Sequence, residues 1–358
     1  MRDLSFYKGK KVLITGHTGF KGSYLTAALI LAGADITGYS LEPPTDPSLF
    51  KLCKLEKDIF HVTGDVRDYE SLLKVFKERK PEIVFHLAAQ PLVRLSYREP
   101  RLTYETNVMG TVNVLEAVRQ TDTVRSVLNV TTDKVYENND LDTAFREDMP
   151  LDGFDPYSNS KSCSELVTHS YVKSFFSDED RVRISTARAG NVIGGGDFAE
   201  DRLIPDCVRA AERKEDIVLR NPDSQRPFQH VMEPVIAYTD IVSAQYEDRN
   251  MADYYNVGPD LSDVKTVGEL SDIFCREWGD GIKTVVKPDG GPHEARFLKL
   301  DCTKLKEKLK WKSIWNVETA VKKTVLWSRV YLSGGDVRKE LFDQVEEYTD
   351  KKVKNDFR

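Results

Sequence analysis

The stretch KKVLITGHTGFKGSYLTAAL, residues 10–29, decides the fold of this chain of 358 residues. It begins with a β-rich run, passes through a loop that contains Gly16, Gly19 and Gly22, and continues as an apolar helical run. Glycines at a strand-to-helix junction let the backbone turn tightly and approach a pyrophosphate, while the helix N-terminus offers unpaired N–H groups to that anion. The context predicts a dinucleotide-binding loop; the alternative is a glycine-rich turn without a cofactor.

The same alternation of short β-rich runs and longer amphipathic stretches fills the first half of the chain. Such alternation predicts parallel strands joined by crossover helices, so the expected fold class is α/β, a Rossmann-type doubly wound parallel sheet. Strands are expected at 10–15, 35–39, 82–88, 125–131 and 181–187, and helices at 20–33, 68–79, 101–120 and 158–176.

The pattern changes after about residue 188, where a glycine cluster and proline-punctuated segments replace the regular alternation. We expect residues 1–188 to form the dinucleotide-binding domain and residues 189–358 to form mainly a smaller, irregular substrate domain. The strand-like DYYNVG, residues 253–258, lies far downstream of the first sheet. The segment 227–258 is therefore expected to return to that sheet.

Composition excludes several classes of protein. Hydrophobic residues make up 40% and charged residues 31% of the chain, which is not the usage of a disordered, collagen-like or coiled-coil protein. A net charge of −6 without a long basic block argues against nucleic acid as a partner. No apolar run approaches the roughly 20 residues of a membrane span, and no signal-peptide core is present, so a cytoplasmic protein without a membrane partner is expected. Five cysteines, an odd number without a CxxC pair, argue against disulfides and a structural metal site.

The residues around the glycine loop bear on the choice of dinucleotide. An acid at the end of the second strand binds the ribose 2′-hydroxyl of NAD, whereas a basic residue there favours NADP. Here the strand ends in GYSLEPP, and Glu42 is the nearest acid, so the balance favours NAD. His17 and Lys21 are expected to add positive charge near the phosphates.

Tyr157 and Lys161 are the first candidate catalytic residues. They are four residues apart at the start of an expected helix, so both lie on one face, where an ammonium can lower the pKa of a phenol. Because the chain has 15 tyrosines, the spacing also arises by chance, as in Tyr7/Lys11 and Tyr348/Lys352. Position distinguishes the first pair: it follows a strand, and Pro156 suits a helix start.

Three further polar residues follow the strand at 125–131, in VTTDKVYE. Open α/β sheets present reactive groups at the carboxyl ends of their strands. Thr132 can hydrogen-bond a substrate hydroxyl beside Tyr157, while Asp133 and Lys134 form a candidate acid/base pair. On spacing alone, an exposed turn pair of little energetic value is an equally good interpretation of Asp133 and Lys134.

Together these segments resemble the extended short-chain dehydrogenase/reductase family that acts on nucleotide sugars. The matching pieces run from about residue 10 to residue 330 and are TGHTGFKG, GDVRD, FHLAAQ, ETNVMGT, TTDKVY, PYSNSK, RAGNVIGGGD, DRLIPD, RPFQHVMEP and YNVGP. The resemblance implies NAD as the cofactor. Within the family, HTGFKGS, LEPPT, RPFQHVMEP and the Asp133-Lys134 pair are similar to the 4,6-dehydratases that act on CDP-glucose, which implies CDP-glucose as the small-molecule partner.

The resemblance also carries the family's binding positions onto matching residues. For the cofactor these are Gly16, His17, Gly19, Phe20, Lys21, Gly22, Asp65, Val66, Leu87, Ala88, Ala89, Asn107, Tyr157 and Lys161. For the substrate they are Gln90, Asn191, Arg202, Leu203, Arg226, Asn256 and Arg296. An arginine fork can bind two phosphate oxygens at once, although each arginine could instead form a structural ion pair, and Asp65-Val66 could be an ordinary turn.

The chemistry that the resemblance implies is an internal redox dehydration. Tyr157 as phenolate, helped by Lys161 and Thr132, removes the proton from the hydroxyl on sugar carbon 4 while hydride goes to NAD. Lys134 then takes the carbon 5 proton, Asp133 protonates the departing carbon 6 hydroxyl, and hydride returns to carbon 6. The nearest alternatives are a 4-epimerase and a dehydratase for another nucleotide sugar. A catalytically silent scaffold is a third, which the intact Thr132, Tyr157 and Lys161 set disfavours.

Assembly is the last expectation. Helices at 101–120 and 158–176 resemble those through which family members associate, and the first carries apolar residues on two faces. We therefore expect a homodimer or a homotetramer built from dimers.

Overall fold

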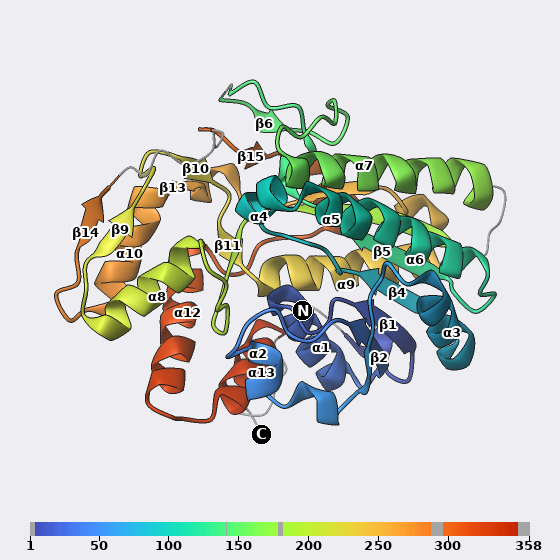
Figure 1. Ribbon diagram of the computed structural model, residues 1–358, viewed down its shortest axis with the longest axis horizontal. Helices are drawn as coiled ribbons and strands as arrows, with labels where there is room; N and C mark the ends of the chain where they lie inside the picture. The colour runs from blue at the N-terminus through green and yellow to red at the C-terminus, as the bar shows by residue number, and fades with distance from the viewer. Residues whose placement is uncertain (1–3, 141, 178–181, 288–295, 350–358) are drawn as a thin grey trace.

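The computed structural model describes residues 4–140, 142–177, 182–287 and 296–349. At its centre lies a seven-stranded sheet of order β12-β7-β5-β4-β1-β2-β3, and each neighbouring pair of strands is parallel (Figure 1). The strands are β1 (Lys11–Thr15), β2 (Asp35–Ser40), β3 (Phe60–Thr63), β4 (Ile83–His86), β5 (Ser126–Val130), β7 (Arg183–Ala189) and β12 (Tyr254–Val257). The predicted α/β class with a doubly wound parallel sheet is confirmed.

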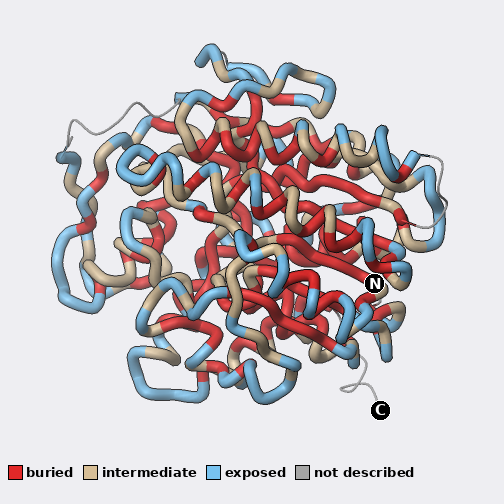
Figure 2. The backbone as a smooth tube through the Cα atoms, turned by 45° about the vertical axis from the view of Figure 1, so that its right-hand side comes forward, coloured by how far each residue is buried: buried red, intermediate tan, exposed pale blue. Residues whose placement is uncertain are grey.

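Helices cover both faces of this sheet, and its central strands β1, β4 and β5 are accordingly rich in buried apolar residues. One face packs against α1 (Phe20–Ala32) and α9 (Met232–Glu247), and α13 (Val337–Tyr348) packs on α1. The other packs against α3 (Tyr69–Arg79), α6 (Gly110–Arg119) and α7 (Pro156–Tyr171). The buried backbone therefore gathers along the sheet and the inner sides of these helices (Figure 2).

Two predicted helices are composite. The stretch expected at 101–120 consists of α5 (Pro100–Tyr104), the π-helical η3 (Glu105–Met109) and α6, and the stretch at 158–176 consists of α7 and the π-helical η5 (Val172–Phe176). The start of α7 is set by two residues: the Asp155 side chain accepts a hydrogen bond from the Ser158 amide at 3.0 Å, and Pro156 occupies the first turn. This fixes where Tyr157 enters the site.

The strand at the far edge of the sheet, β3, gave no clear signal in the sequence, because it is short and none of its residues is fully buried. The opposite edge is β12, which pairs with β7 in the register Tyr254↔Thr186. The expected return of residues 253–258 to the first sheet is thus confirmed.

The rest of the chain packs beside the carboxyl ends of the strands as shorter elements around a second apolar cluster. Its helices are α8 (Leu203–Arg213), α10 (Val267–Trp278), α11 (Thr303–Leu309) and α12 (Val317–Leu332), while α2 (Leu49–Leu52) and α4 (Val93–Arg98) lie in the first half. Paired short strands are β6 (Ala144–Phe145) with β15 (Lys299–Leu300), β8 (Val192–Ile193) with β11 (Gln229–His230), β9 (Ile217–Leu219) with β14 (Thr284–Val286), and β10 (Gln225–Arg226) with β13 (Lys265–Thr266). Within the described ranges no helix is long and apolar enough to cross a membrane.

Candidate active site

The glycine loop joins β1 to α1 and is packed so tightly that side chains are excluded at two of its positions. A Cβ on Gly16, which has φ +78°, would lie 2.6 Å from the Ala88 amide nitrogen. A Cβ on Gly22 would lie 2.2 Å from the Gly16 carbonyl oxygen. Gly19 is the N-cap of α1 and accepts from the Ser23 amide at 2.8 Å, so the start of the helix faces the loop. The loop therefore keeps the exposed backbone that a pyrophosphate requires.

His17 lies in this loop, but it does not supply the positive charge that the sequence suggested. Its side chain is fully buried against Gly38, and Nε2 lies 2.7 Å from Nδ1 of His61. Burial, reinforced by His61, lowers the pKa of His17 to about 3. The imidazole is consequently neutral near pH 7, and that part of the prediction is wrong.

Lys21 reaches the catalytic groups. Its Nζ lies 3.4 Å from the Tyr238 hydroxyl, and its charge interacts with those of Arg202, Asp133 and Lys161. Burial, together with the neighbouring cations, lowers the pKa of Lys21 to about 7 in spite of Asp133. Lys21 therefore lies within electrostatic reach of one buried carboxylate and of several other cations.

The segment after β4 lines the other side of the loop. Leu87 donates its amide to the Thr15 carbonyl at 3.0 Å, the Ala88 amide donates to Thr15 Oγ1 at 3.3 Å, and Ala88 and its neighbour Ala89 are half-buried residues. Near the adenine position expected by resemblance, the Asp65 carboxylate accepts from Arg67 at 2.6 Å, and Val66 is buried.

Two residues expected in this region serve the scaffold instead. The side chain of Asn107, only 1% exposed, donates to the Gln90 carbonyl at 3.1 Å and to Ser160 Oγ at 2.9 Å. The side-chain amide nitrogen of Gln90, Nε2, donates to the Leu92 carbonyl and to Thr103 Oγ1. The side-chain N–H groups of both residues thus donate to protein acceptors. They are not free to donate to a cofactor, as expected for Asn107, or to the substrate, as expected for Gln90.

Tyr157 and Lys161 lie on successive turns of α7 and are 9% and 4% exposed. Burial raises the pKa of Tyr157 to about 12, although the Thr132 hydroxyl acts to lower it. Burial lowers the pKa of Lys161 to about 8, and its Nζ donates to the Val130 carbonyl at 3.1 Å. Both groups are therefore held in a dry site at the end of β5.

Asp133 and Lys134 follow β5 in a short turn, η4 (Asp133–Val135), and they are not an exposed pair. The Asp133 side chain is 0% exposed, and its Oδ1 accepts from Lys134 Nζ at 2.9 Å and from Thr132 Oγ1 at 3.0 Å. Lys134 Nζ also donates to Asn191 Oδ1 at 3.2 Å. Asp133 Oδ2 is buried without a hydrogen-bond partner among the described residues, which leaves one acceptor for a bound molecule.

The arginines expected at the substrate divide by burial. Arg202, the N-cap of α8 beside Leu203, pairs with Asp197 at 2.9 Å, and its charge reaches Tyr157. Arg226 is 7% exposed, whereas Arg296 is exposed on the surface.

Asn256 does not fit the substrate role. It is fully buried, its Oδ1 accepts from the Tyr136 hydroxyl at 2.6 Å, and its Nδ2 donates to the carbonyls of Phe145 and Asp301. Asn256 is therefore a structural tie, and the predicted substrate contact is wrong.

The chance Tyr-x-x-x-Lys matches lie elsewhere. The Tyr7 hydroxyl donates to the Thr239 carbonyl at 2.7 Å, and Lys352 lies outside the described residues. Sequence reasoning missed Tyr136, Glu165 and Arg188, which form a buried network behind the site; the spacing of Glu165, four residues after Lys161, was the available signal.

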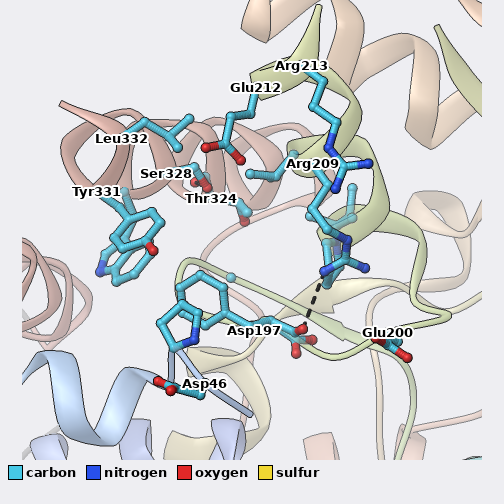
Figure 3. A pocket seen from close by; sticks show the side chains of 18 residues that line it. Asp46, Asp197, Glu200, Arg209, Glu212, Arg213, Thr324, Ser328, Tyr331 and Leu332 are labelled. Atoms are coloured by element: carbon cyan, nitrogen blue, oxygen red, sulfur yellow. Dashed lines mark hydrogen bonds between the residues drawn. The ribbon is translucent and has the colours of Figure 1, made fainter. Parts of the chain in front are cut away.

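A hollow of about 330 Å³ lies between α8 and α12, next to Asp197. Figure 3 shows Arg209, Glu212 and Tyr331 around it, and Arg209 donates to the Phe198 carbonyl at 3.3 Å. No predicted site residue lines this hollow, so it is distinct from the catalytic groups.

The chain is similar to known proteins along most of its length. The chain is 45% identical over 342 residues to the CDP-glucose 4,6-dehydratase of Salmonella typhimurium strain LT2, which covers 94% of this chain and 95% of that protein. Among solved structures, the dTDP-glucose 4,6-dehydratase of Bacillus anthracis in complex with NAD superposes with a TM-score of 0.74 at 22% identity, covering 92% of this chain and 100% of that one. The UDP-glucose 4-epimerase of Thermotoga maritima with UDP-glucose gives 0.77 at 24% identity, covering 90% and 99%.

At such identities the two solved structures show the shared fold alone. The family is shown by sequence: the model described as GDP-mannose 4,6 dehydratase matches residues 13–324, which include the glycine loop, the turn after β5 and the start of α7. The chain therefore belongs to the GDP-mannose 4,6 dehydratase family.

Proposed function

We propose that this chain is an NAD-dependent CDP-glucose 4,6-dehydratase, a hydro-lyase that converts CDP-glucose to CDP-4-keto-6-deoxyglucose and water. One observation carries the proposal: Asp133, fully buried and paired with Lys134, also accepts a hydrogen bond from Thr132, and both Thr132 and the charge of Asp133 act on Tyr157. A 4-epimerase needs Tyr157 and Lys161 but has no proton to remove from carbon 5. The 45% identity to a CDP-glucose 4,6-dehydratase supports cytosine as the nucleobase of the substrate.

The glycine loop fits a dinucleotide, because a Cβ at Gly16 or Gly22 would collide with the Ala88 amide nitrogen or the Gly16 carbonyl oxygen and force the loop out of the tight turn that a pyrophosphate-binding loop needs. Gly16, Gly19, Phe20 and the backbone at Leu87–Ala89 would hold the pyrophosphate and nicotinamide side, and Lys161 the ribose. NAD, when bound, supplies the acceptor for the hydride from sugar carbon 4 and its donor to carbon 6.

The proton steps belong to the chain's own residues. Tyr157 removes the proton of the carbon 4 hydroxyl, and Thr132, which already lowers its pKa, orients that hydroxyl. The carbon 4 ketone acidifies the carbon 5 proton, which Lys134 accepts once its amine is free of Asp133. Asp133 in turn gives a proton to the departing carbon 6 hydroxyl, and Lys134 returns its proton to carbon 5 when hydride reaches carbon 6. Water is the only group lost, and no reductant is consumed overall.

The diphosphate of the substrate is assigned to three arginines that follow β7 in the sequence. Arg202, Arg226 and Arg296 are proposed to bind phosphate oxygens, with Leu203 offering a backbone amide at the start of α8. Asn191, which already contacts Lys134, is proposed to bind the sugar diphosphate next to the reacting carbons. The division of the chain into a dinucleotide-binding part, residues 1–188 with 227–258, and a substrate part follows from this assignment.

We place the enzyme in the cytoplasm as a homodimer or homotetramer that serves dideoxysugar and O-antigen biosynthesis. All five cysteines are free thiols, which suits a reducing compartment. Exposed apolar side chains on α7 and on the two π-helical segments, Met109, Leu166 and Phe175, suit contact with a second copy.

The experiment that tests the function supplies NAD and, in separate reactions, the glucose conjugates of CDP, UDP, dTDP and GDP. Mass spectrometry follows loss of one water, and absorbance follows net reduction of NAD. Water loss confined to CDP-glucose without accumulating reduced cofactor is the expected result. An isomer formed without water loss would establish a 4-epimerase instead, and water loss with another base would keep the reaction but change the substrate.

A further inference from the structure

A buried ion pair that the proposed chemistry does not use lies next to both catalytic segments. Glu165 is on α7, one turn beyond Lys161, and Arg188 is on β7; they are 0% and 1% exposed, and Arg188 Nη2 lies 2.9 Å from Glu165 Oε2. Burial alone would raise the pKa of Glu165, but the His169 imidazole, whose Nε2 lies 3.3 Å from Glu165 Oε2, and the charge of Arg188 lower it to about 2. The pair is therefore fully ionised near neutral pH.

The ion pair holds the catalytic turn at both of its ends. Thr131, which directly precedes Thr132, donates its hydroxyl to Glu165 Oε1. Tyr136, two residues after Lys134, accepts at its hydroxyl from Arg188 Nη1 at 2.9 Å. The turn that carries the proposed acid and base is thus fastened to the helix that carries Tyr157.

Tyr136 extends the connection to the elements that follow the sheet. Its ring stacks on Phe145 of β6 with centroids 4.9 Å apart, and its hydroxyl donates to Asn256 Oδ1 at 2.6 Å. Asn256 Nδ2 donates onward to the carbonyls of Phe145 and Asp301, which flank the β6–β15 pair. The hydroxyl of Tyr136 therefore joins three parts of the molecule at one atom.

Stability alone is a poor explanation for this arrangement. Desolvation offsets much of the attraction in a buried ion pair, and apolar replacements of similar volume are often equally stable. What a directional network of this kind adds is a single geometry. Geometry matters most for the proton transfer at carbon 5, because a misplacement of about 1 Å can reduce a rate by about 100-fold.

We infer that Tyr136, held by the Arg188–Glu165 pair, is a positioning residue that fixes Lys134 and Asp133 relative to Tyr157. The inference rests on the proposed dehydratase function. It adds the residue that holds the elimination groups in a fixed position relative to the oxidation groups. Loss of the hydroxyl should affect the dehydration half-reaction, whose acid and base both lie on the fastened turn, more than the oxidation at carbon 4, whose base Tyr157 and its partner Lys161 lie on α7 and which draws only Thr132 from the turn.

The test is Tyr136→Phe, which keeps the ring stacked on Phe145 and removes only the hydroxyl. With CDP-glucose and NAD, kcat for water loss should fall by about 10- to 100-fold while KM changes by less than about threefold. Reduced cofactor should accumulate transiently in rapid-mixing absorbance, because oxidation then outpaces elimination. Thr131→Val, at the other end of the turn, should show the same signature.

Tyr7→Phe is the matched control, since Tyr7 is 1% exposed and also donates its hydroxyl to a buried acceptor, the Thr239 carbonyl, which is not part of the Glu165–Arg188–Tyr136 network. It should lower the melting temperature comparably and leave the kinetics unchanged. A Tyr136→Phe enzyme with unchanged kcat, or with oxidation and dehydration slowed equally, overturns the positioning role. A wild-type chain that dehydrates no nucleotide sugar overturns the proposed function and this inference with it.

Discussion

Lys134 Nζ lies 2.9 Å from Asp133 Oδ1, and the carboxylate that it meets is completely buried while the amine is partly exposed. The proton donor and acceptor of the proposed elimination are thus already in contact, and the second carboxylate oxygen is left without a protein partner among the described residues. A proton can pass between them without a large movement of the chain.

Lys134→Met is expected to lower the rate of water loss by about 100- to 10,000-fold, the range typical of a lost general base. Oxidation at carbon 4 should survive in part, because Tyr157 and Lys161 are intact. The measurement is single-turnover formation of reduced cofactor beside mass-spectrometric detection of water loss. Lys134→Arg separates two roles: it keeps the charge beside Asp133 but cannot act as a base at neutral pH, so an active Arg variant would show that Lys134 contributes charge alone. Asp133→Asn should block elimination in the same way.

Gly22→Ala is expected to weaken NAD binding by at least about tenfold, because the new methyl group would lie 2.2 Å from the Gly16 carbonyl oxygen and force the loop open. Fluorescence titration with NAD measures the effect. Gly19→Ala is the comparison: its Cβ would lie 3.4 Å from the same oxygen, so the free loop tolerates it. A Gly22→Ala chain that binds NAD like the wild type would remove the glycine loop from the cofactor site.

Lys161→Met should stabilise the folded chain at pH 7 while abolishing activity. The pKa of Lys161 is lowered from 10.5 to about 8 in the fold, so the unfolded state binds the extra proton between these values and stability rises with pH across that window. Below about pH 8, burial of the charged Lys161 ammonium lowers the free energy of unfolding by its full amount, on the order of 3 kcal/mol at most. Urea unfolding from pH 7 to 10.5 should show the gap between variant and wild type closing. Lys77→Met, on an exposed position of α3, should show no gap at any pH.

Glu165→Gln should destabilise the chain at pH 7 by about 3–5 kcal/mol, because Arg188 then stays buried without its counter-charge. The pKa of Glu165 is lowered from 4.5 to about 2, so its contribution is fully present above about 4.5 and is lost as the pH falls toward 2. Unfolding midpoints should therefore converge for wild type and variant in acid. Parallel curves down to pH 2 would show that Glu165 is not the ionised partner of Arg188.

A Met109→Glu, Leu166→Glu double variant should shift the chain toward the monomer, since both side chains are about half exposed and lie on the helices expected to pair. Light scattering at micromolar concentration measures the mass. Ile314→Glu changes an equally exposed apolar residue elsewhere and should leave the assembly intact. A wild-type monomer would contradict the expected association directly.

The sequence was most informative where a local pattern had one physical meaning. Gly16 and Gly22 indicated the loop because only glycine fits there, and Pro156 with Asp155 indicated the start of α7. It was misleading where the partner of a side chain comes from a distant segment. From the sequence, His17 was expected to be a cation, but its ring nitrogen contacts His61, which is 44 residues away. Asn256 was expected to bind substrate, but its side-chain oxygen accepts a hydrogen bond from Tyr136.

The Arg188–Glu165 pair marks the same limit from the other side. Nothing in the residues around Arg188 distinguishes a buried arginine from an exposed one, because the carboxylate that neutralises it lies 23 residues earlier on another element. Such a pair becomes visible only when α7 and β7 are packed together.

The position of β12 has a consequence for how the enzyme is made. β12 ends at Val257 and is the only neighbour of β7 on that side of the sheet, so the edge of β7 stays unpaired until the ribosome has released more than two-thirds of the chain. An open edge of a parallel sheet invites pairing with other nascent chains. Asn256, the hydrogen-bond partner of Tyr136, lies on β12. The hydrogen bond that Tyr136 donates to Asn256 can therefore form only once β12 has been synthesised and has joined the sheet.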